Sequence, residues 1–400
     1  MSEQSYRYII IGAGLGGVSA IEGIRQVDAQ GSILLLGKEK DSPYDRPPLT
    51  KQLWSGTKTV DEVWLHDQEF YRTQRVDMRL GATVEAVDLA SHSVRDSSEV
   101  TFRYDRLLLA TGGRPKRLKI PGGDLEGIFY YRTLADYRRL RSAAVEGRSA
   151  LVIGGNFIGS EIAAALRINN LSVSMIFPSS RLGSRVFPES LGRYLTDFYQ
   201  AKGVQIHSGD APLAIARANG AYIAKTRAGL ELRADIIVAG VGITPEISLA
   251  SAAGLQTGDG VIVNEFLQTS HPDVYAAGDI ASFPEAVLGR RRIEHWDNAL
   301  AQGKHAGRNM AGAHEPFTYL PFFFSDLFEF GYEAVGQIDS RLETYADWQE
   351  ENKTGVIYYL EGGRVRGAMM CNVWGKVDAA RALIQQAPPV DTAHLRGLIN

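Results

Sequence analysis

Apolar positions at the start of the chain predict a strand, a glycine turn, a helix and a second strand. The stretch "YRYIIIGAGLGGVSAIEGIRQVDAQGSILLLGKE" places apolar runs on both sides of a segment with helical spacing. Residues 151–240 repeat this order and contain "VIGGNFIGSEIAAALRINNLSVSMIF". Two strand–helix–strand units in one chain are typical of two nucleotide-binding domains with parallel sheets.

Two similar segments mark the ends of these units. "EVTFRYDRLLLATGG", from residue 99, and "LELRADIIVAGVG" at 230–242 each predict a short strand, a turn at Asp105 or Asp235, and a buried strand that ends in glycine. A further apolar strand, "TSHPDVYAAGDIA" at 269–281, ends in Gly-Asp. These strands are predicted to complete the two units.

From about residue 316 the pattern changes to strands that look antiparallel. "YEAVGQID", "GVIYYLEGG" and "RVRGAMMCNVW" are followed by a helix near 376–386. The predicted fold class is α/β, with two Rossmann-like domains plus a C-terminal α+β domain. The predicted domains are 1–117 as the first part of domain one, 118–242 as an inserted second domain, 243–315 as the remainder of domain one, and 316–400.

The first glycine turn has the spacing of a dinucleotide fingerprint. Gly12, Gly14 and Gly17 form G-x-G-x-x-G, in which the first glycine makes the turn, the second lets backbone approach a pyrophosphate, and the third lets helix pack on strand. The helix N-terminus adds N–H groups and a positive dipole end for phosphates. Glu39 is the candidate for the ribose hydroxyls, with a plain surface charge as the alternative.

The second glycine turn departs from the fingerprint in two places. Gly154, Gly155 and Gly159 shape the turn, but Asn156 stands at the middle position and the second strand ends in Phe177 without a carboxylate. We expect Asn156 to be tolerated because asparagine adopts unusual backbone angles more readily than most residues. The missing bond to the ribose, worth roughly 1.5–3 kcal/mol, predicts a dinucleotide site that is weakened and not abolished.

Residues after that second strand favour the phosphorylated coenzyme. Without the carboxylate no negative charge repels the extra phosphate of NADPH, Ser179 and Ser180 can donate hydrogen bonds, and Arg181 or Arg185 could bind a phosphate through two hydrogen bonds. The alternative is that both arginines are solvated loop charges. The sequence predicts a site that prefers NADPH or fails to discriminate.

Composition and charge exclude several classes of protein. A net charge of -3 gives no electrostatic case for nucleic acid or an anionic membrane. No apolar run in the chain approaches the roughly 20 residues of a membrane helix, and no leader-type segment stands ahead of the first strand, so we expect a cytoplasmic protein. Cys371 is the only cysteine and cannot form a redox pair or hold a cluster. We therefore expect a bound organic cofactor and no metal.

Several motifs together resemble the two-dinucleotide-binding-domain flavoprotein family. They are "IIIGAGLGG", "PYDRPPLTKQLW", "LLLATGGRP", "VIGGNFIGSE", "AGVGITP" and "VYAAGDIA". Within it they are similar to the ferredoxin-reductase and apoptosis-inducing-factor branch, because "RPPLTK" stands where disulfide reductases carry a cysteine pair. The resemblance covers essentially the whole chain and implies the glutathione-reductase-like fold, FAD in the first unit, NAD(P)H in the second, and a C-terminal domain that covers the flavin.

The resemblance also implies roles for individual residues. Lys51 and Glu161 would pair beside the reactive flavin nitrogen, Phe157 would cover the face where nicotinamide stacks, and His295 would be a further catalytic residue at the ring. The implied cofactor contacts also include Arg46, Val84, Thr111, Gly112, Arg132, Ile158, Gly242, Gly278, Asp279, Glu294, Trp296 and Phe324.

Residue chemistry supports some of these roles independently. A cation near a flavin stabilises the reduced ring, and a carboxylate can hold that cation in place. Asp279 ends an apolar strand, where a carboxylate is costly without a partner such as a sugar hydroxyl. For Lys51 or Glu161 alone the alternative is an exposed helix charge, and for His295 a histidine with ordinary partners. The segment "PFFFSDLF" is core or a subunit interface, which leaves a homodimer open, and Phe324 stands where relatives tend to carry tryptophan.

The predicted function is that of an FAD-dependent NAD(P)H oxidoreductase, which passes a hydride from nicotinamide to FAD and electrons onward to a ferredoxin, a quinone or a small molecule. One alternative is a redox-sensing protein with slow turnover. Another is an FAD enzyme that has lost nicotinamide binding and oxidises its own substrate. Anaerobic titration with NAD(P)H separates the three, because they differ in whether the flavin bleaches and whether air reverses the change.

Overall fold

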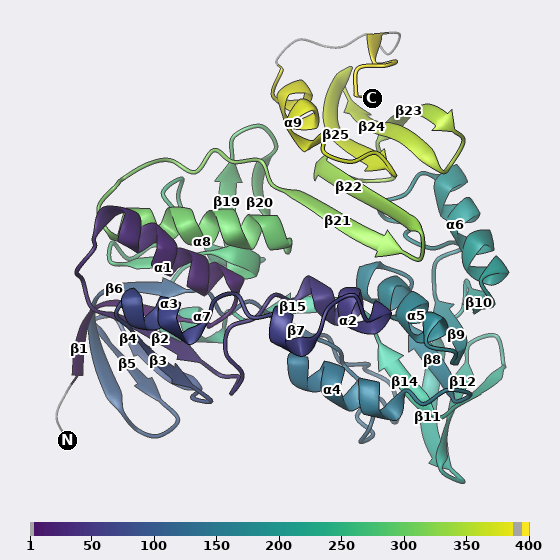
Figure 1. Ribbon diagram of the computed structural model, residues 1–400, viewed down its shortest axis with the longest axis horizontal. Helices are drawn as coiled ribbons and strands as arrows, with labels where there is room; N and C mark the ends of the chain where they lie inside the picture. Colours follow the sequence, from purple (N-terminus) through teal and green to yellow (C-terminus); the bar gives the residue numbers. More distant parts are fainter. Residues whose placement is uncertain (1–3, 387–393, 400) are drawn as a thin grey trace. The chain divides into compact units, whose positions relative to one another are not determined.

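The computed structural model describes residues 4–386 and 394–399, and these divide into two compact units (Figure 1). Unit 1 contains the described residues up to Asp45, together with Val60–Arg114 and Pro245–Pro321. Unit 2 contains Arg46–Thr59, Pro115–Thr244 and the described residues from Phe322 onward. The domain borders predicted from the sequence stay a prediction.

Unit 1 is built on a largely parallel sheet with the strand order β3-β2-β1-β6-β18. Strand β2 is buried along its whole length, as expected where a parallel sheet is covered on both faces. The chain reverses the direction of strand addition between β1 and β6, and ligands of such sheets bind at that point, beyond the carboxyl ends of the strands. The strands are β1 (Gln4–Ile11), β2 (Ile33–Gly37), β3 (Val76–Leu80), β6 (Thr101–Leu109) and β18 (Val274–Ala276).

The predicted turn at Asp105 is wrong, because β6 runs through this position without a break. Its first half, Thr101–Arg103, pairs with antiparallel β5 (Ser93–Asp96), and its second half, Leu107–Leu109, pairs with parallel β18. The change of neighbour within one strand produces the polar interruption that resembled a turn. At Asp235 the prediction is confirmed, since β13 (Glu231–Ala234) ends there and β14 (Ile236–Ala239) begins.

Helices α1 (Leu15–Val27) and α8 (Trp296–Met310) lie side by side in unit 1 (Figure 1). A Cβ built on Gly303 would lie 2.2 Å from the carbonyl oxygen of Gly16, and glycine is therefore needed for the backbones to approach. The other elements of this unit are β4 (Val84–Asp88), β16 (Thr257–Gly258), β17 (Gly260–Ile262), β19 (Ala281–Glu285), β20 (Gly289–Arg292), η2 (Val60–Glu62), α3 (Gln68–Thr73), α7 (Ser248–Ala252) and η3 (Gly278–Ile280).

Unit 2 contains a second parallel sheet, with the order β10-β9-β8-β14, and an antiparallel sheet with the order β11-β12-β13. Besides β13 and β14, the strands of these sheets and the helices between them are α4 (Leu134–Ala143), β8 (Ser149–Ile153), α5 (Phe157–Ile168), β9 (Ser172–Phe177), α6 (Glu189–Ala201), β10 (Gln205–Ser208), β11 (Pro212–Ala218) and β12 (Ala221–Thr226). The loop that carries Lys51 forms η1 (Pro47–Thr50) and α2 (Gln52–Ser55). Short strands β7 (Gly113–Pro115) and β15 (Ile243–Pro245) pair with each other.

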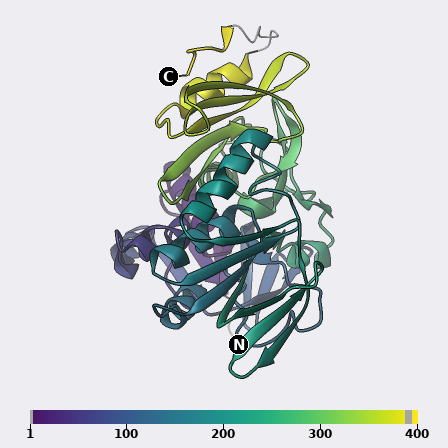
Figure 2. The same ribbon diagram turned by 90° about the vertical axis from the view of Figure 1, so that its right-hand side faces the viewer.

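The C-terminal part of unit 2 is an antiparallel sheet with the order β21-β22-β25-β24-β23, whose strands lie side by side in Figure 2. Its elements are β21 (Phe322–Leu327), β22 (Phe330–Gly336), β23 (Glu343–Glu350), β24 (Thr354–Glu361), β25 (Arg364–Cys371) and α9 (Val377–Gln385). The predicted strands and helix are confirmed, and β21 and β23 are additions. Two Rossmann-like sheets followed by this sheet confirm the predicted fold class.

Candidate active site

The first glycine turn is shaped by protein packing at two positions and left open at the third. Gly12 has φ of +118°, and a Cβ there would lie 2.1 Å from the carbonyl oxygen of Ala110. A Cβ on Gly17 would lie 1.9 Å from the carbonyl oxygen of Gly12. A Cβ on Gly14 would meet no protein atom within 4 Å. The protein itself requires Gly12 and Gly17, whereas Gly14 keeps clear the space that a pyrophosphate would occupy at the start of α1.

The second glycine turn has the same frame. Gly154 has φ of +121°, and a Cβ there would lie 2.3 Å from the carbonyl oxygen of Gly240. Asn156, the N-cap of α5, has φ of -109° and ψ of -173°, close to the values of Gly14 at the same place in α1. This is extended backbone that any residue adopts, so the expectation that Asn156 uses unusual angles is wrong. What asparagine changes is the space above the turn, because its side chain is exposed there.

The carboxylate position at the end of β9 is filled by an aromatic ring. Phe177 is buried, and a Cβ built on Gly155 would lie 2.7 Å from its ring. Beyond it, Ser179 Oγ donates a hydrogen bond to the carbonyl oxygen of Arg181 at 2.9 Å, and Arg185 is exposed. Arg185 is therefore accessible from solvent, whereas the hydroxyl of Ser179 already donates a hydrogen bond within its own loop.

The structure brings Lys51 and Glu161 together in the interior of unit 2. Lys51 Nζ lies 2.5 Å from Glu161 Oε1, and the two side chains are 8% and 6% exposed. Thr50 donates its hydroxyl to Glu161 Oε2 at 2.6 Å, and Ser325 donates to Oε1 at 2.5 Å. The alternative of exposed helix charges is therefore wrong for this pair. Because both charges are withdrawn from water, removing one of them would cost roughly 3–5 kcal/mol.

Strand β21 supplies further groups around this pair. The ring of Phe324 lies 5.6 Å from Lys51 Nζ, a distance suited to a cation–π contact. Burial raises the pKa of Asp326, an effect that Lys51 opposes and Glu161 reinforces. Sequence reasoning missed Thr50, Ser325 and Asp326, because "PFFFSDLF" indicated only core or interface and a hydroxyl next to Lys51 carries no distinctive pattern.

Phe157 opens α5 and is 38% exposed, with its ring edge-to-face against Phe323 at 5.6 Å between centroids. Ile158 follows it in the helix. A hollow beside Phe157 is lined by residues from the second glycine turn, the loop after β9 and the C-terminal sheet, namely Gly155, Asn156, Ser160, Gly183, Val186, Phe187, Ser325, Leu327 and Tyr332. The exposed ring of Phe157 is suited to stacking with a flat ring, whereas the hollow itself, of about 10 Å³, has room for about one water molecule.

In unit 1, His295 is the N-cap of α8 and is electrically neutral at ordinary pH. Burial lowers the pKa of His295 to about 4, and the negative charge of Asp279 opposes this shift. Trp296 Nε1 donates to Asp45 at 2.6 Å, and Glu294 accepts from Arg292 at 2.5 Å. The two residues next to His295 in the sequence, Glu294 and Trp296, therefore each have a hydrogen-bond partner in the protein.

Glu39 lies two residues beyond β2 and is half-buried, and it accepts a hydrogen bond from the hydroxyl of Tyr44 at 2.6 Å. A plain surface charge does not describe it. The other predicted positions are distributed as follows: Val84 begins β4, Thr111 donates to the carbonyl oxygen of Glu246, Gly112 and Gly242 have φ of +68° and +94°, Gly278 donates to Gln302, and Arg46 donates to the carbonyl oxygen of Arg132.

These features define a class of protein. Two Rossmann-like sheets each end in a glycine turn at a helix N-terminus, and the open space at Gly14 fits the close approach of a dinucleotide phosphate. A buried lysine–glutamate pair adds a fixed positive charge. The fold and these sites are those of a flavin-dependent oxidoreductase that uses a nicotinamide nucleotide.

Comparisons with known proteins support the class and give the family. Residues 6–303 match the family described as pyridine nucleotide-disulphide oxidoreductase, and residues 306–354 match the one described as apoptosis-inducing factor, mitochondrion-associated, C-terminal. Apoptosis-inducing factor 1, mitochondrial, of Dictyostelium discoideum is 35% identical over 95% of this chain and 78% of its own length.

Two further relatives cover nearly the whole chain. The ferredoxin–NAD(+) reductase component of the anthranilate 1,2-dioxygenase system of Burkholderia cepacia is 34% identical over 97% of this chain and 96% of its own. The reductase in the crystal structure of the covalent putidaredoxin reductase–putidaredoxin complex has a TM-score of 0.91, with 30% identity over 99% of this chain and 96% of that one. The chain belongs to the pyridine nucleotide-disulphide oxidoreductase family and is similar to its ferredoxin reductases and apoptosis-inducing factors.

The chain is therefore an FAD-dependent NAD(P)H oxidoreductase, as predicted from its motifs. The family name refers to disulphide chemistry that this chain does not carry out within itself, because Cys371 is its only cysteine, and it is buried. Burial raises the pKa of the Cys371 thiol far above its usual range. In the described part of the chain, no helix is long and apolar enough to cross a membrane.

Proposed function

We propose that this oxidoreductase delivers its electrons to a ferredoxin. The observation that carries the proposal is the absence of a cysteine pair: "RPPLTK" stands where a dithiol relay would be, and the one thiol is buried. Because this chain has no cysteine pair, electrons cannot leave it through a dithiol of its own. This favours an acceptor that takes them directly from the flavin. The similarity to ferredoxin reductases over nearly the full length supports this choice over a quinone or a small molecule.

The chain's own residues have defined tasks in this proposal. The turn at Gly12–Gly17 and the N-terminus of α1 hold the phosphates of FAD, and the second turn and α5 hold those of the nicotinamide nucleotide. When bound, FAD supplies the chemistry of hydride acceptance and single-electron release. Lys51 places a positive charge that favours electron gain, and Glu161 holds its ammonium group in one position with the help of Thr50 and Ser325.

An anaerobic experiment tests the proposal. The flavin is reduced with NADPH or NADH and mixed with a [2Fe–2S] ferredoxin, menadione or air, and the rate of each oxidation is followed at the flavin band. We expect the second-order rate constant for oxidation of the reduced flavin by the ferredoxin to exceed that for menadione at least tenfold. A long-wavelength charge-transfer band that persists in air would instead favour the redox-sensing alternative. No bleaching with either coenzyme would favour an enzyme that oxidises its own substrate.

We further propose that the nicotinamide site is weak and prefers NADPH or fails to discriminate. Phe177 occupies the place of the usual carboxylate, so no negative charge repels a 2′-phosphate, and Arg185 is exposed nearby in sequence. The limiting rates and half-saturation concentrations of flavin reduction are measured with both coenzymes for the parent, Arg181→Ala and Arg185→Ala. A preference for NADH of tenfold or more, unchanged in both variants, would contradict the proposal.

A cytoplasmic location and a homodimer stay predictions from the sequence. Fractionation of cells that express the protein and sedimentation of the purified flavoprotein test the two predictions separately.

A further inference from the structure

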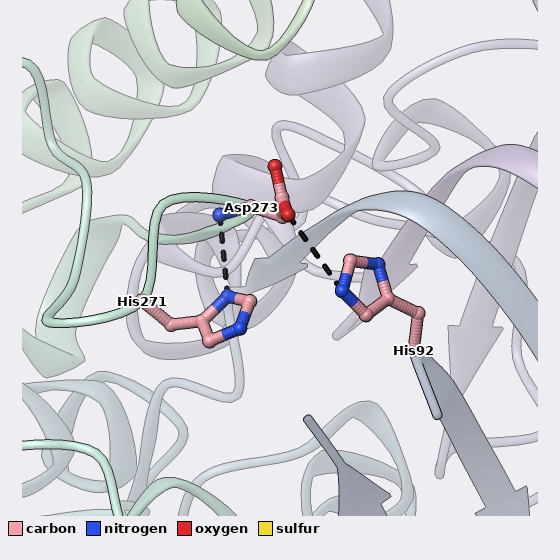
Figure 3. Close-up of side chains that lie close together, drawn as sticks. All are labelled: His92, His271 and Asp273. Carbon is pink, nitrogen blue, oxygen red and sulfur yellow. Dashed lines mark hydrogen bonds and ion pairs between the residues drawn. The ribbon is translucent and has the colours of Figure 1, made fainter. Parts of the chain in front are cut away.

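Three side chains from distant parts of unit 1 converge at a place that none of the roles above uses. They are His92, His271 and Asp273, drawn in Figure 3. Nε2 of His92 lies 3.7 Å from Asp273 Oδ2, and one candidate ligand atom from each of the three lies within 4.8 Å of the other two. Among residues 4–386 and 394–399 this is the one group of three or more histidine, cysteine or acidic side chains with such spacing.

The backbone on both sides of the group is held in place. The carbonyl oxygen of His92 accepts a hydrogen bond from the N–H of Tyr104 at 2.9 Å, and the imidazole stacks on the Tyr104 ring at 5.4 Å. The carbonyl oxygen of Asp273 accepts from Leu107 N–H at 2.9 Å, and that of His271 accepts from Val274 N–H at 3.2 Å. The three side chains therefore project from a fixed frame, which lowers the entropy cost of holding an ion.

The two imidazole rings are also close to one another, with centroids 5.6 Å apart and planes at 76°. The N–H of Asp273 donates to Nδ1 of His271 at 3.3 Å, a long and weak hydrogen bond that an ion at this nitrogen would replace. For metal–ligand bonds of about 2.0–2.1 Å the ligand atoms must approach one another by roughly 1 Å, which small side-chain rotations supply.

Arg106 determines how the carboxylate can be used. Its Nη1 lies 2.7 Å from Asp273 Oδ1, which leaves Oδ2 as the oxygen that faces His92. A metal-bound carboxylate with a hydrogen-bond donor on its second oxygen is a common arrangement, because the donor fixes the ligand's orientation. The same guanidinium lowers the affinity for a dication, so the site should be of moderate and not of extreme strength.

The group is open to solvent on one side. Its His92 side chain is 39% exposed, and His92 and Arg106 also line a hollow of about 430 Å³ together with Arg7 and Asp105. An ion can therefore enter, and a water molecule can fill a remaining coordination position. Two imidazoles and one carboxylate favour Zn²⁺ over Mg²⁺ or Ca²⁺, which prefer oxygen ligands alone.

We propose that His92, His271 and Asp273 form a zinc site. The ion would join the turn before β5 to the turn before β18. Both of these strands pair with β6, on the side opposite β1. Asp273 directly precedes the amino end of β18, whereas the glycine turn follows the carboxyl end of β1. The two places therefore lie at opposite ends of the parallel strands of one sheet. The site is therefore separate from the flavin-binding edge and acts on the cohesion of unit 1.

The test uses the full flavin-loaded chain, stripped of metal with a chelator and titrated with Zn²⁺ against a chromogenic zinc chelator. We expect one zinc per chain, bound at least tenfold more weakly by His92→Ala and by Asp273→Asn. The matched control is His66→Ala, because His66 Nε2 lies 2.9 Å from Glu22 in the same unit and forms a histidine–carboxylate pair without belonging to the group. That control should bind zinc as the parent does.

A second measurement reports the ligands directly. Cu²⁺ is bound in place of Zn²⁺ and measured by electron paramagnetic resonance. Its electron spin should couple to the nitrogen nuclei of two imidazoles in the parent and of one in His92→Ala. Retention of the flavin spectrum checks that each variant is folded, and His271→Gln replaces any that is not. Zinc affinity within twofold of the parent in both ligand variants, an equal loss in His66→Ala, or copper without nitrogen coupling would each overturn the proposal.

Discussion

The two glycine turns of this protein share one frame and differ at the position that faces a ligand. In each, the first glycine has a positive φ, and a Cβ built on it would collide with a nearby carbonyl oxygen. That oxygen belongs to Ala110, directly after β6, in the first turn and to Gly240, directly after β14, in the second. The middle position is Gly14 in the first turn and Asn156 in the second, with nearly the same backbone angles. Packing fixes the outer glycines, and only ligand approach requires the middle one.

The helices after the two turns differ as well. Counted from the first glycine of each turn, Glu161 of α5 corresponds to Ser19 of α1, and both are buried. In unit 2 that position carries a charge and its partner Lys51, whereas in unit 1 it carries a hydroxyl. The same scaffold therefore serves cofactor binding in one unit and, as we propose, charge stabilisation in the other.

The largest effect is expected from Gly14→Val, which should abolish FAD binding. Its side chain would enter the space kept open for the pyrophosphate, yet a Cβ there meets no protein atom within 4 Å, so the fold should persist. The measurement is the ratio of flavin to protein after reconstitution, with circular dichroism to check folding. Gly17→Ala is the contrast, because its Cβ would lie 1.9 Å from the carbonyl oxygen of Gly12 and should disturb the turn itself. A flavin-saturated Gly14→Val protein would contradict this division of roles.

Lys51→Ala should slow flavin reduction at least tenfold and lower the flavin potential. The variant leaves Glu161 buried and negative without its cation, which opposes added charge on a reduced ring and costs roughly 3–5 kcal/mol of stability. Stopped-flow rates and the midpoint potential measure the first effect, and thermal unfolding measures the second. Adding Glu161→Gln should recover stability but not rate. Rates within twofold of the parent would show that the pair is structural.

A smaller effect is expected from Asn156→Gly, which restores the fingerprint of the second turn. Because the backbone at Asn156 is already extended, the change opens space without releasing strain. We expect NADPH and NADH to bind about two- to tenfold more tightly, equivalent to about 0.4–1.4 kcal/mol. The concentration dependence of flavin reduction gives the affinities, and Asn169→Gly at the other end of α5 is the control. Weaker binding in Asn156→Gly would show that the amide contacts the coenzyme.

The smallest effect concerns protonation in unit 1. Since burial lowers the pKa of His295 to about 4, its ring should remain neutral at pH 5.5, where an exposed imidazole is mostly charged. The unfolded chain takes up this proton between about pH 6.5 and 4 and the folded chain does not, so acidification through that window should reduce stability. NMR of ¹³C- and ¹⁵N-labelled histidine, assigned with His295→Gln, measures the titration. A midpoint above pH 6 would contradict the prediction.

The sequence by itself determined the order of the elements around both turns. Apolar runs and glycine spacing are local signals, and they located β1, α1, β8, α5 and the strands of the C-terminal sheet that have clear apolar patterns. Lys51 and Glu161 were identified by the resemblance of their motifs to those of a known family, and not by these local signals. Strand β23 was missed because it is an edge strand with mostly polar, exposed positions, and the turn wrongly placed at Asp105 followed from a polar stretch inside a strand.

Only the tertiary structure decided which groups meet. Ser325 reaches Glu161 across 164 positions of sequence, and His92 lies beside His271 although the two are far apart in the chain. Tertiary structure also showed that Asn156 needs no unusual backbone angle and that Phe177 closes the carboxylate position. The physical reason is that hydrogen bonds and ion pairs depend on distances of about 3 Å, which are set by how strands and helices pack and leave no periodic trace in the sequence.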